Sequence, residues 1–196
     1  MAPEVTELAQ KTAARSAAEE ALLDAAERLL LDVGHAGITT RRLAEEAGVN
    51  HGLVHYYFGS NENLLVRTLE RFTERLIDRQ RQLYASDLPF VEKWRAAMRY
   101  LVSEDVAYEK VWLELQALAW NNGDLRERLA RVNAEWRVVL TGALEAPHRE
   151  LGIELPLGAL VSLVMTFNLG MMVERQGGIE TGHAELLDWI DRWLSS

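Results

Sequence analysis

Residues 37–65 read GITTRRLAEEAGVNHGLVHYYFGSNENLL, and this segment has the pattern of two short helices joined by a tight turn. Thr39 is a suitable N-cap for a helix that continues to about Ala47, because its hydroxyl can accept a hydrogen bond from a free backbone amide of the first turn. Gly48 is expected to end that helix, and a second short helix is expected over residues 51–57. Two helices joined by such a turn make a helix-turn-helix unit.

The apolar residues of this segment are spaced so that they can pack the two helices together. They are Leu43, Ala44, Ala47, Val49, Val54 and Phe58. The residues left to project outward are Asn50, His51, Gly52, His55, Tyr56 and Tyr57. An α-helix fits the major groove of DNA, and the residues of its N-terminal part can reach base edges. The segment therefore predicts binding to double-stranded DNA.

One long helix is expected before this unit. Ser16 and Glu19 have the spacing of a capping box, in which each side chain satisfies a free amide of the other residue. The helix is therefore expected to begin at Ser16 and to end at Gly34. Residues 1–16 would form a polar arm without the apolar core of a signal peptide.

Helical periodicity continues to the end of the chain, and no segment shows the two-residue alternation of a strand. Ser60 is a suitable N-cap for a long helix, residues 147–156 are expected to be a linker, and an apolar helix follows over about 157–175. The chain is expected to be all-α with about nine helices. Residues 1–60 would hold the arm and a three-helix DNA-binding module, and residues 61–196 a larger helical domain.

The composition of the chain excludes several classes of site. Of its 196 residues 48% are hydrophobic and 26% charged, which predicts a packed core. The absence of cysteine excludes disulfides, thiolate catalysis and zinc sites that need sulfur, and it fits a cytoplasmic protein. Residues 157–173 carry no charge but fall short of the roughly 20 residues of a membrane span, so a helix buried in protein is expected.

Catalytic motifs and metal-binding patterns are missing from the sequence. There is no phosphate-binding glycine loop, zincin motif or nucleophile elbow, so no enzyme and no cofactor are expected. His51 and His55 have the i, i+4 spacing of a metal pair, but the sequence places no third ligand near them. Contact with bases or phosphates is the preferred interpretation of both histidines.

The quoted segment resembles the DNA-binding domain of the tetracycline-repressor (TetR) family. The shared pattern is a Thr-capped helix, an Ala-Gly-Val turn, a short recognition helix ending in aromatic residues and a Leu-Leu start to the next helix. The close match covers roughly residues 22–69, and the remainder resembles the family in helix number and pattern. The resemblance implies a cytoplasmic homodimer that represses transcription from a palindromic operator and is released by a small-molecule effector.

The resemblance also implies roles for individual residues. Thr40 and Arg41 would clamp phosphate at the start of their helix, and Arg41 would also reach a base. His51, Gly52 and His55 would face bases. Tyr56 would lie against the sugar-phosphate backbone. The candidate DNA-contacting set is completed by Thr39, Asn50, Tyr57 and Asn61.

Two features weigh against strong electrostatic DNA binding. The family normally has lysine where this chain has Asn61, and asparagine can bond a phosphate but releases no counterion. Residues 1–60 contain five basic and nine acidic residues, and the net charge of the chain is -9. Most of these acids would lie on the outer face of the first helix, away from the DNA groove. The affinity for DNA is therefore expected to depend on direct contacts and dimerisation, which predicts a shallow salt dependence. A dimeric ligand-binding or interaction module that has lost DNA binding remains the alternative.

Large adaptable side chains in the second domain are candidates to line a ligand pocket. They are Trp94, Met98, Trp112, Trp120, Trp136, Met165, Phe167 and Met171. Such linings suit apolar or amphipathic ligands, although each residue could equally belong to the core. Glu109 and Glu114 would favour a cationic ligand if they faced the pocket, but they are expected to lie in solvent.

A dimer interface is expected on the last two helices. One short recognition helix reads too few bases, so two copies should bind two half-sites. A four-helix bundle with the partner could be formed by Leu160, Val164, Phe167, Met171, Leu187, Ile190 and Trp193. The alternative is that these residues complete the core of one subunit.

Overall fold

The computed structural model describes residues 3–195, without the side chains of residues 3–16, His35 and Asn61. Its α-helices are α1 (Pro3–Val33), α2 (Thr40–Ala47), α3 (Gly52–Phe58), α4 (Asn61–Ala85), α5 (Phe90–Arg99), α6 (Val106–Ala119), α7 (Gly123–Glu150), α8 (Leu157–Gln176) and α9 (His183–Leu194). A 3-10 turn covers His35–Gly37 and a π-helical segment covers Tyr100–Glu104. The described residues contain no strand, which confirms the all-α prediction.

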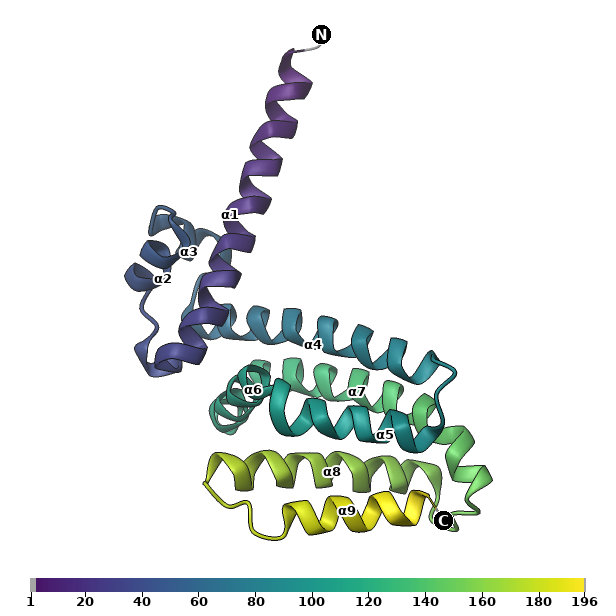
Figure 1. Ribbon diagram of the computed structural model, residues 1–196. Helices are drawn as coiled ribbons and strands as arrows, with labels where there is room; N and C mark the ends of the chain where they lie inside the picture. The colour runs from purple at the N-terminus through teal and green to yellow at the C-terminus, as the bar shows by residue number, and fades with distance from the viewer. Residues whose placement is uncertain (1–2, 196) are drawn as a thin grey trace.

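The helices form two groups that share α4 (Figure 1). The C-terminal half of α1 packs with α2 and α3 at one end of the molecule. From there α4 runs into a layered bundle, in which α7 contacts α4, α6 and α8. The layer of α8 and α9 lies farthest from α2 and α3 (Figure 1). The two groups are therefore linked by one continuous helix.

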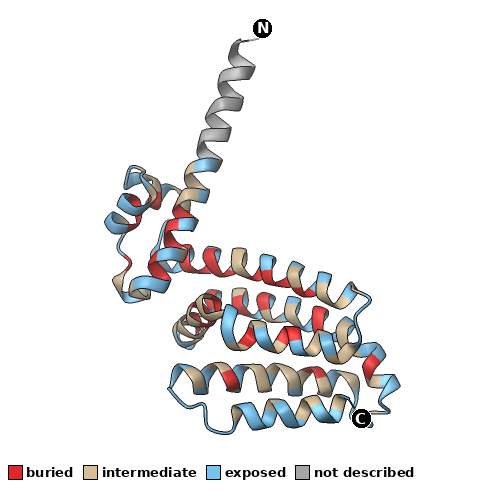
Figure 2. Cartoon of the chain, viewed as in Figure 1, coloured by how far each residue is buried: buried red, intermediate tan, exposed pale blue. Residues whose placement is uncertain are grey.

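One hydrophobic core passes through the junction of the two groups. It includes Leu22 of α1, Leu43 of α2 and Phe58 of α3, and it continues through Leu69 of α4 to Leu115 of α6. Figure 2 shows buried stretches on α1 and on the first turns of α4, on either side of the junction. We place the boundary between the two proposed domains at the start of α4, and the core continues across it.

Two helix boundaries differ from the sequence prediction. The first helix begins at Pro3, so the predicted N-cap at Ser16 is wrong and that residue lies within α1. The reason is that residues 4–15 are mostly good helix formers, which extend the helix beyond the capping signal. The predicted linker over 147–156 is also too long, because α7 includes Pro147 and ends at Glu150. Pro147 is buried, and this apolar burial offsets the backbone hydrogen bond that proline cannot donate.

The apolar helix α8 is less buried in the single chain than expected. It has 20 residues and a mean hydropathy of 1.6, so by length and composition alone it could cross a membrane. Only 11% of that apolar window is buried, and the buried residues of the helix are Val161 and Met171. The single chain therefore does not bury this helix, and the prediction that it is buried in protein requires another molecule to cover its apolar surface.

Candidate nucleic-acid interface and ligand cavity

The start and end of α2 are fixed by the residues that the sequence indicated. Thr39 has extended backbone angles, and its Oγ1 accepts a hydrogen bond of 3.1 Å from the amide of Arg42. Gly48 ends the helix with φ at +67°, a conformation that a Cβ atom would strain. The hydrogen bond of Thr39 and the positive φ of Gly48 confirm the two predicted caps of α2. Together they set the angle at which the chain enters α3.

The entry to α3 depends on Asn50. Its Oδ1 accepts a hydrogen bond of 2.8 Å from the amide of Gly52. A Cβ atom on Gly52 would lie 3.3 Å from this oxygen, so a larger residue would disturb the contact. Val54 and Phe58 are buried beneath the helix. Asn50, predicted as a DNA contact, therefore has a structural part in shaping α3.

The outer face of α3 carries polar and aromatic side chains. His51, His55 and Tyr56 are exposed. The Nδ1 atom of His55 lies 3.2 Å from the carbonyl oxygen of Gly59. Since a carbonyl oxygen can only accept, Nδ1 donates and the neutral ring keeps Nε2 as an acceptor. Tyr57 is half-buried and meets the ring of Tyr56 edge to face at 5.0 Å, so it packs toward the core.

Each arginine in the described side chains of residues 17–60 is held by a carboxylate. The pairs are Arg28 with Glu46 at 2.7 Å, Arg41 with Glu45 at 2.8 Å and Arg42 with Asp32 at 3.6 Å. The bond from Glu45 raises the pKa of Arg41 still further above its ordinary value. Exposed pairs of this kind contribute little to stability. A phosphate can therefore replace the carboxylate, but it must compete with it.

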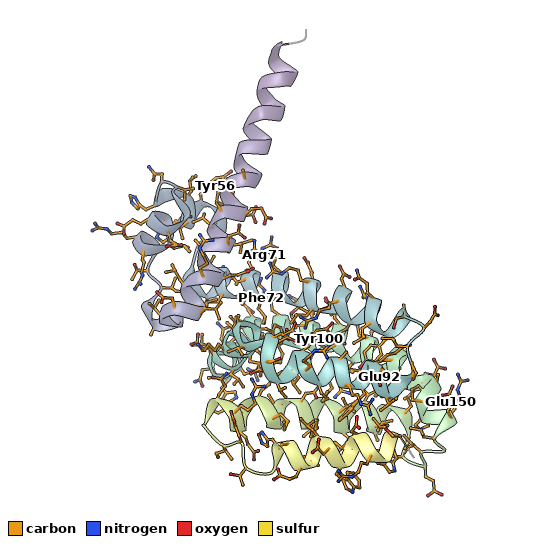
Figure 3. The ribbon with its side chains drawn as sticks, in the orientation of Figure 1. Tyr56, Arg71, Phe72, Glu92, Tyr100 and Glu150 are labelled. Carbon is orange, nitrogen blue, oxygen red and sulfur yellow. The ribbon has the colours of Figure 1, made fainter. Side chains whose placement is uncertain are left out.

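Acidic residues of α1 form ion pairs with arginines of α4, although some of these carboxylates remain exposed. These contacts are Arg67 with Glu19 at 3.3 Å, Arg71 with Glu20 at 3.0 Å, Arg71 with Asp24 at 2.8 Å and Arg75 with Glu27 at 2.8 Å; Arg71 also bonds Glu27. Figure 3 shows Arg71 at the junction of the two helices. Together the pairs hold α1 against α4. The side chain of Asn61 lies outside the described side chains, so its predicted phosphate contact rests on the sequence.

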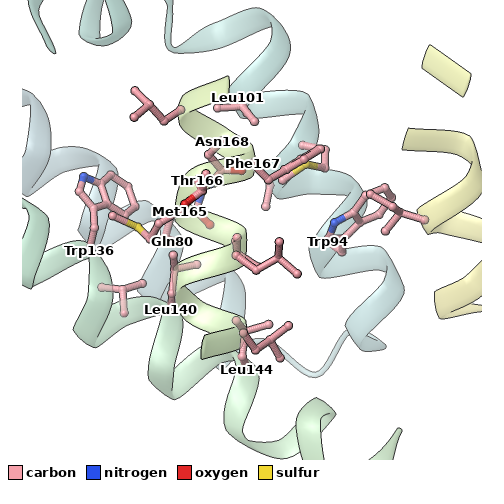
Figure 4. Close-up of a pocket in the computed structure, with 18 of the residues that line it drawn as sticks. Gln80, Trp94, Leu101, Trp136, Leu140, Leu144, Met165, Thr166, Phe167 and Asn168 are labelled. Atoms are coloured by element: carbon pink, nitrogen blue, oxygen red, sulfur yellow. The ribbon is translucent and has the colours of Figure 1, made fainter. Parts of the chain in front are cut away.

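A cavity of about 800 Å³ lies within the second group of helices. Six of the eight predicted pocket residues line it, namely Trp94, Met98, Trp112, Trp136, Met165 and Phe167. Figure 4 labels four of them, Trp94, Trp136, Met165 and Phe167. The other two are placed elsewhere. Trp120 follows the last residue of α6 and is 80% exposed, and Met171 is buried outside the lining, where the neighbouring Met172 faces the cavity instead.

The aromatic end of the cavity is ordered by one hydrogen bond. Trp136 Nε1 donates to the hydroxyl oxygen of Tyr108 at 2.8 Å. The Tyr108 ring is parallel to that of Trp112, with centroids 6.2 Å apart. Burial raises the pKa of Tyr108 above its ordinary value, so its hydroxyl stays neutral. Tyr108 therefore adds no charge to this end of the cavity, and its hydroxyl fixes the position of the Trp136 ring.

The expectation that Glu109 lies in solvent is wrong. Its side chain is fully buried and accepts a bond of 3.3 Å from Arg175 of α8. Arg175 also donates to the carbonyl oxygen of Leu101 at 2.6 Å. Burial raises the pKa of Glu109, and the neighbouring guanidinium opposes this shift. The pair joins α6, α8 and the π-helical segment, so it is structural and does not face the cavity. Glu114 is half-buried.

The last two helices present apolar residues on two sides. Of the predicted interface residues, Leu160, Val164, Ile190 and Trp193 border the cavity, and Leu187 is half-buried. The large apolar side chains that are 41–58% exposed on these helices are Leu163, Leu169, Val173, Leu186, Trp189 and Trp193, which we call the α8–α9 apolar face. All of them except Val173 also border the cavity. No residue of α9 is buried, and Asp191 ties the helix to Arg95 of α5 at 2.6 and 2.8 Å.

Comparisons with known proteins agree with this arrangement. Residues 22–68 match the family described as "Bacterial regulatory proteins, tetR family". The chain is 30% identical to the HTH-type transcriptional repressor KstR2 of Rhodococcus jostii (strain RHA1) over 146 residues. This match covers 70% of this chain and 69% of that protein.

Within the part of the chain that the structure describes, no group of three or more His, Asp or Glu side chains could hold a metal ion.

Solved structures show the same fold at low sequence identity. A TetR transcription regulator from Haloarcula marismortui has a TM-score of 0.74 at 19% identity, covering 91% of this chain and 96% of that one. The transcriptional regulator FadR from Bacillus subtilis, crystallised in complex with stearoyl-CoA, has a TM-score of 0.70 at 16% identity, covering 90% and 97%. At these identities the likeness establishes the fold alone.

Proposed function

The chain belongs to the tetR family of bacterial regulatory proteins and is a transcriptional regulator, and on this premise we propose that it is a homodimeric repressor released from a palindromic operator by a small apolar or amphipathic ligand. The observation that carries the proposal is the course of α4. Its first turns share the core of α1, α2 and α3, and further along Leu76, Gln80 and Tyr84 line the cavity. A ligand in the cavity therefore touches the helix that supports the DNA-binding module.

We assign the DNA contacts to the exposed face of α2 and α3. His55 presents Nε2 as an acceptor, which suits the amino groups of cytosine or adenine in the major groove. Thr40 and Arg41 lie at the start of α2, where backbone amides and a guanidinium can hold phosphate. We also assign Tyr56, which is 62% exposed, to contact with the sugar-phosphate backbone of the DNA.

We assign dimerisation to the α8–α9 apolar face. A single chain leaves these leucine and tryptophan side chains in water, and pairing with a second copy would bury them. Two recognition helices must then lie about 34 Å apart to reach successive major grooves. A ligand that favours a different spacing would lower operator affinity by a population shift. We expect the protein to act in the cytoplasm, with the partner subunit and not lipid covering α8.

The proposal is tested by fluorescence anisotropy with the promoter DNA beside the protein's own gene and a scrambled duplex, at about 150 mM salt, where non-specific binding is weak. We expect nanomolar affinity for the promoter alone. His55→Ala and Arg41→Ala should each weaken it by about tenfold or more. Arg126→Ala, an exposed change on α7, is the matched control and should leave it unchanged. Equal affinity for both duplexes would contradict the proposal.

The alternative, a ligand-binding dimer with weak or lost DNA binding, is favoured by one observation. The described arginines of residues 17–60 are all engaged by carboxylates, and Asn61 stands where the family normally has lysine. Asn61→Lys separates the two functions. If this change creates specific binding where the natural chain has none, the alternative holds. For the repressor we expect a shallow salt dependence, and a slope of log K against log salt near about -8 to -10 would contradict that expectation.

A further inference from the structure

Two side chains of the cavity carry buried polar atoms that lack a hydrogen-bond partner. They are Gln80 of α4 and Asn168 of α8, whose Oε1 and Oδ1 atoms are buried. Gln80 is only 9% exposed. In Figure 4 both lie among apolar side chains, between Trp136 on one side and Trp94 on the other. A buried polar atom without a protein partner is costly, so each of these carboxamides would gain from a polar group in whatever fills the cavity.

The ionisable groups of the described lining are engaged, neutral or in solvent. Asp105 is bonded by Arg79, with both carboxylate oxygens at 2.7 Å. His148 Nε2 bonds the carbonyl oxygen of Leu155 at 2.7 Å. Burial raises the pKa of Tyr84 to about 12. Arg137 is exposed, and its Nη1 donates to Ser162 at 3.1 Å. A ligand charge buried deep in the cavity would therefore meet no free counter-charge, and the guanidinium of Arg137 is available only at the exposed rim.

We propose that the effector is an uncharged, largely apolar molecule with a hydroxyl group that bonds the carboxamides of Gln80 and Asn168. A hydroxyl both donates and accepts, so it suits a carboxamide in either orientation. This inference deepens the function proposed above and rests on it. It also explains how a ligand would act on DNA binding, because Gln80 lies on α4 and Asn168 on the helix of the proposed dimer face.

The experiment measures ligand binding to the purified full-length protein without DNA. The probes are 1-pyrenebutanol, 1-pyrenebutyrate and 1-butylpyrene, which share one apolar skeleton. Binding is followed by quenching of tryptophan emission, since Trp94, Trp112 and Trp136 line the cavity. We expect the alcohol to bind about three- to tenfold more tightly than the hydrocarbon. It should bind at least about tenfold more tightly than the carboxylate, which must lose its hydration.

Two substitutions of similar size locate the polar contact. Gln80→Met and Asn168→Leu should each weaken alcohol binding by about three- to tenfold and leave hydrocarbon binding unchanged or tighter. Neither should lower the melting temperature, because each removes a buried polar atom without a partner. Thr166→Val is the matched control on α8. Its hydroxyl already donates to the carbonyl oxygen of Ser162 at 2.9 Å, so alcohol binding should not change.

Three results would overturn the inference: tighter binding of the carboxylate, equal losses for alcohol and hydrocarbon in the two variants, or no binding of any probe up to its solubility limit. Operator binding is measured separately on the same protein. If the alcohol preference holds and no operator is bound, the ligand class stands and the repressor function fails. If an operator is bound and the alcohol preference fails, only the ligand class is withdrawn.

Discussion

The DNA-binding module and the α8–α9 layer are built on opposite principles. In the module, Leu22 and Leu43 are fully buried and Phe58 nearly so. In the outer layer, α9 has no buried residue and α8 has two, while tryptophan and leucine side chains face outward. Both regions are rich in apolar residues. The difference is that the single chain buries those of the module and leaves those of α8 and α9 exposed.

The module is therefore complete within one chain, whereas the outer layer leaves apolar surface that its own chain does not cover. The module buries its apolar residues within one chain, which gives a rigid surface for α3. The outer layer leaves apolar residues exposed, and under the proposed function a partner copy and a ligand would cover them. Under that proposal the geometry of the layer would respond to what binds there.

The largest expected effect tests whether the module is the rigid region. Phe58→Ala should destabilise the protein by about 3–5 kcal/mol, because it empties a space in the shared core. Chemical denaturation at fixed protein concentration measures the change. Tyr56→Ala on the same helix is the control, and it should cost about 1 kcal/mol or less while still weakening DNA binding. If Phe58→Ala and Tyr56→Ala lowered stability equally, the contrast between the buried module and the exposed outer layer would be contradicted.

A second large effect concerns the buried pair that ties the outer layer to the core. Arg175→Met should destabilise the protein by about 3 kcal/mol at pH 7, because it leaves Glu109 charged and buried. The pKa of Glu109 is already raised, so the folded chain binds its proton at a higher pH than the unfolded chain does. Stability from this group is therefore lost as pH rises above 4.5, and the deficit of the variant should shrink on acidification. A deficit independent of pH would count against this account.

An intermediate effect tests whether the outer layer is completed by a partner. Trp189→Asp, at a position 57% exposed, should raise the dimer dissociation constant by about a hundredfold, or roughly 3 kcal/mol. Analytical ultracentrifugation measures it. Val138→Asp on α7, at a position 69% exposed, is the control and should leave the dimer intact. Dissociation by both variants, or by neither, would show that the α8–α9 apolar face is not the interface.

The smallest effect tests the caps that position the recognition helix. Thr39→Ala removes the oxygen that accepts from the amide of Arg42 and should cost about 1 kcal/mol. Ser60→Ala, which removes the similar contact to Asn63 at 3.1 Å, should cost about the same. Thermal denaturation compares the two. A loss of operator affinity for Thr39→Ala that exceeds its loss of stability would indicate that this hydroxyl also contacts DNA.

Local patterns in the sequence predicted much of the module. Thr39, Gly48 and Ser60 act through neighbours within a few residues, so their positions as caps could be inferred directly. The Ser16 signal failed because a cap is decided by competition between neighbouring segments, and the residues before it also favour helix. The sequence predicts a DNA contact for Asn50, and only the tertiary structure shows that its Oδ1 accepts a hydrogen bond from the amide of Gly52.

The all-α class, the two caps of α2 and the exposed face of α3 could be inferred from the sequence, because each follows from residue spacing within a short segment. Most of the aromatic cavity lining could be inferred from side-chain type, although its residues come from several helices. The ion-pair partners of charged residues, and the side of α8 that borders the cavity, could be known only from the tertiary structure. Glu109 meets Arg175 from 66 residues away, and Arg71 meets the acids of α1. Because α8 is apolar around most of its circumference, its periodicity could not distinguish the cavity side from the exposed side, which depends on where α4, α7 and α9 lie.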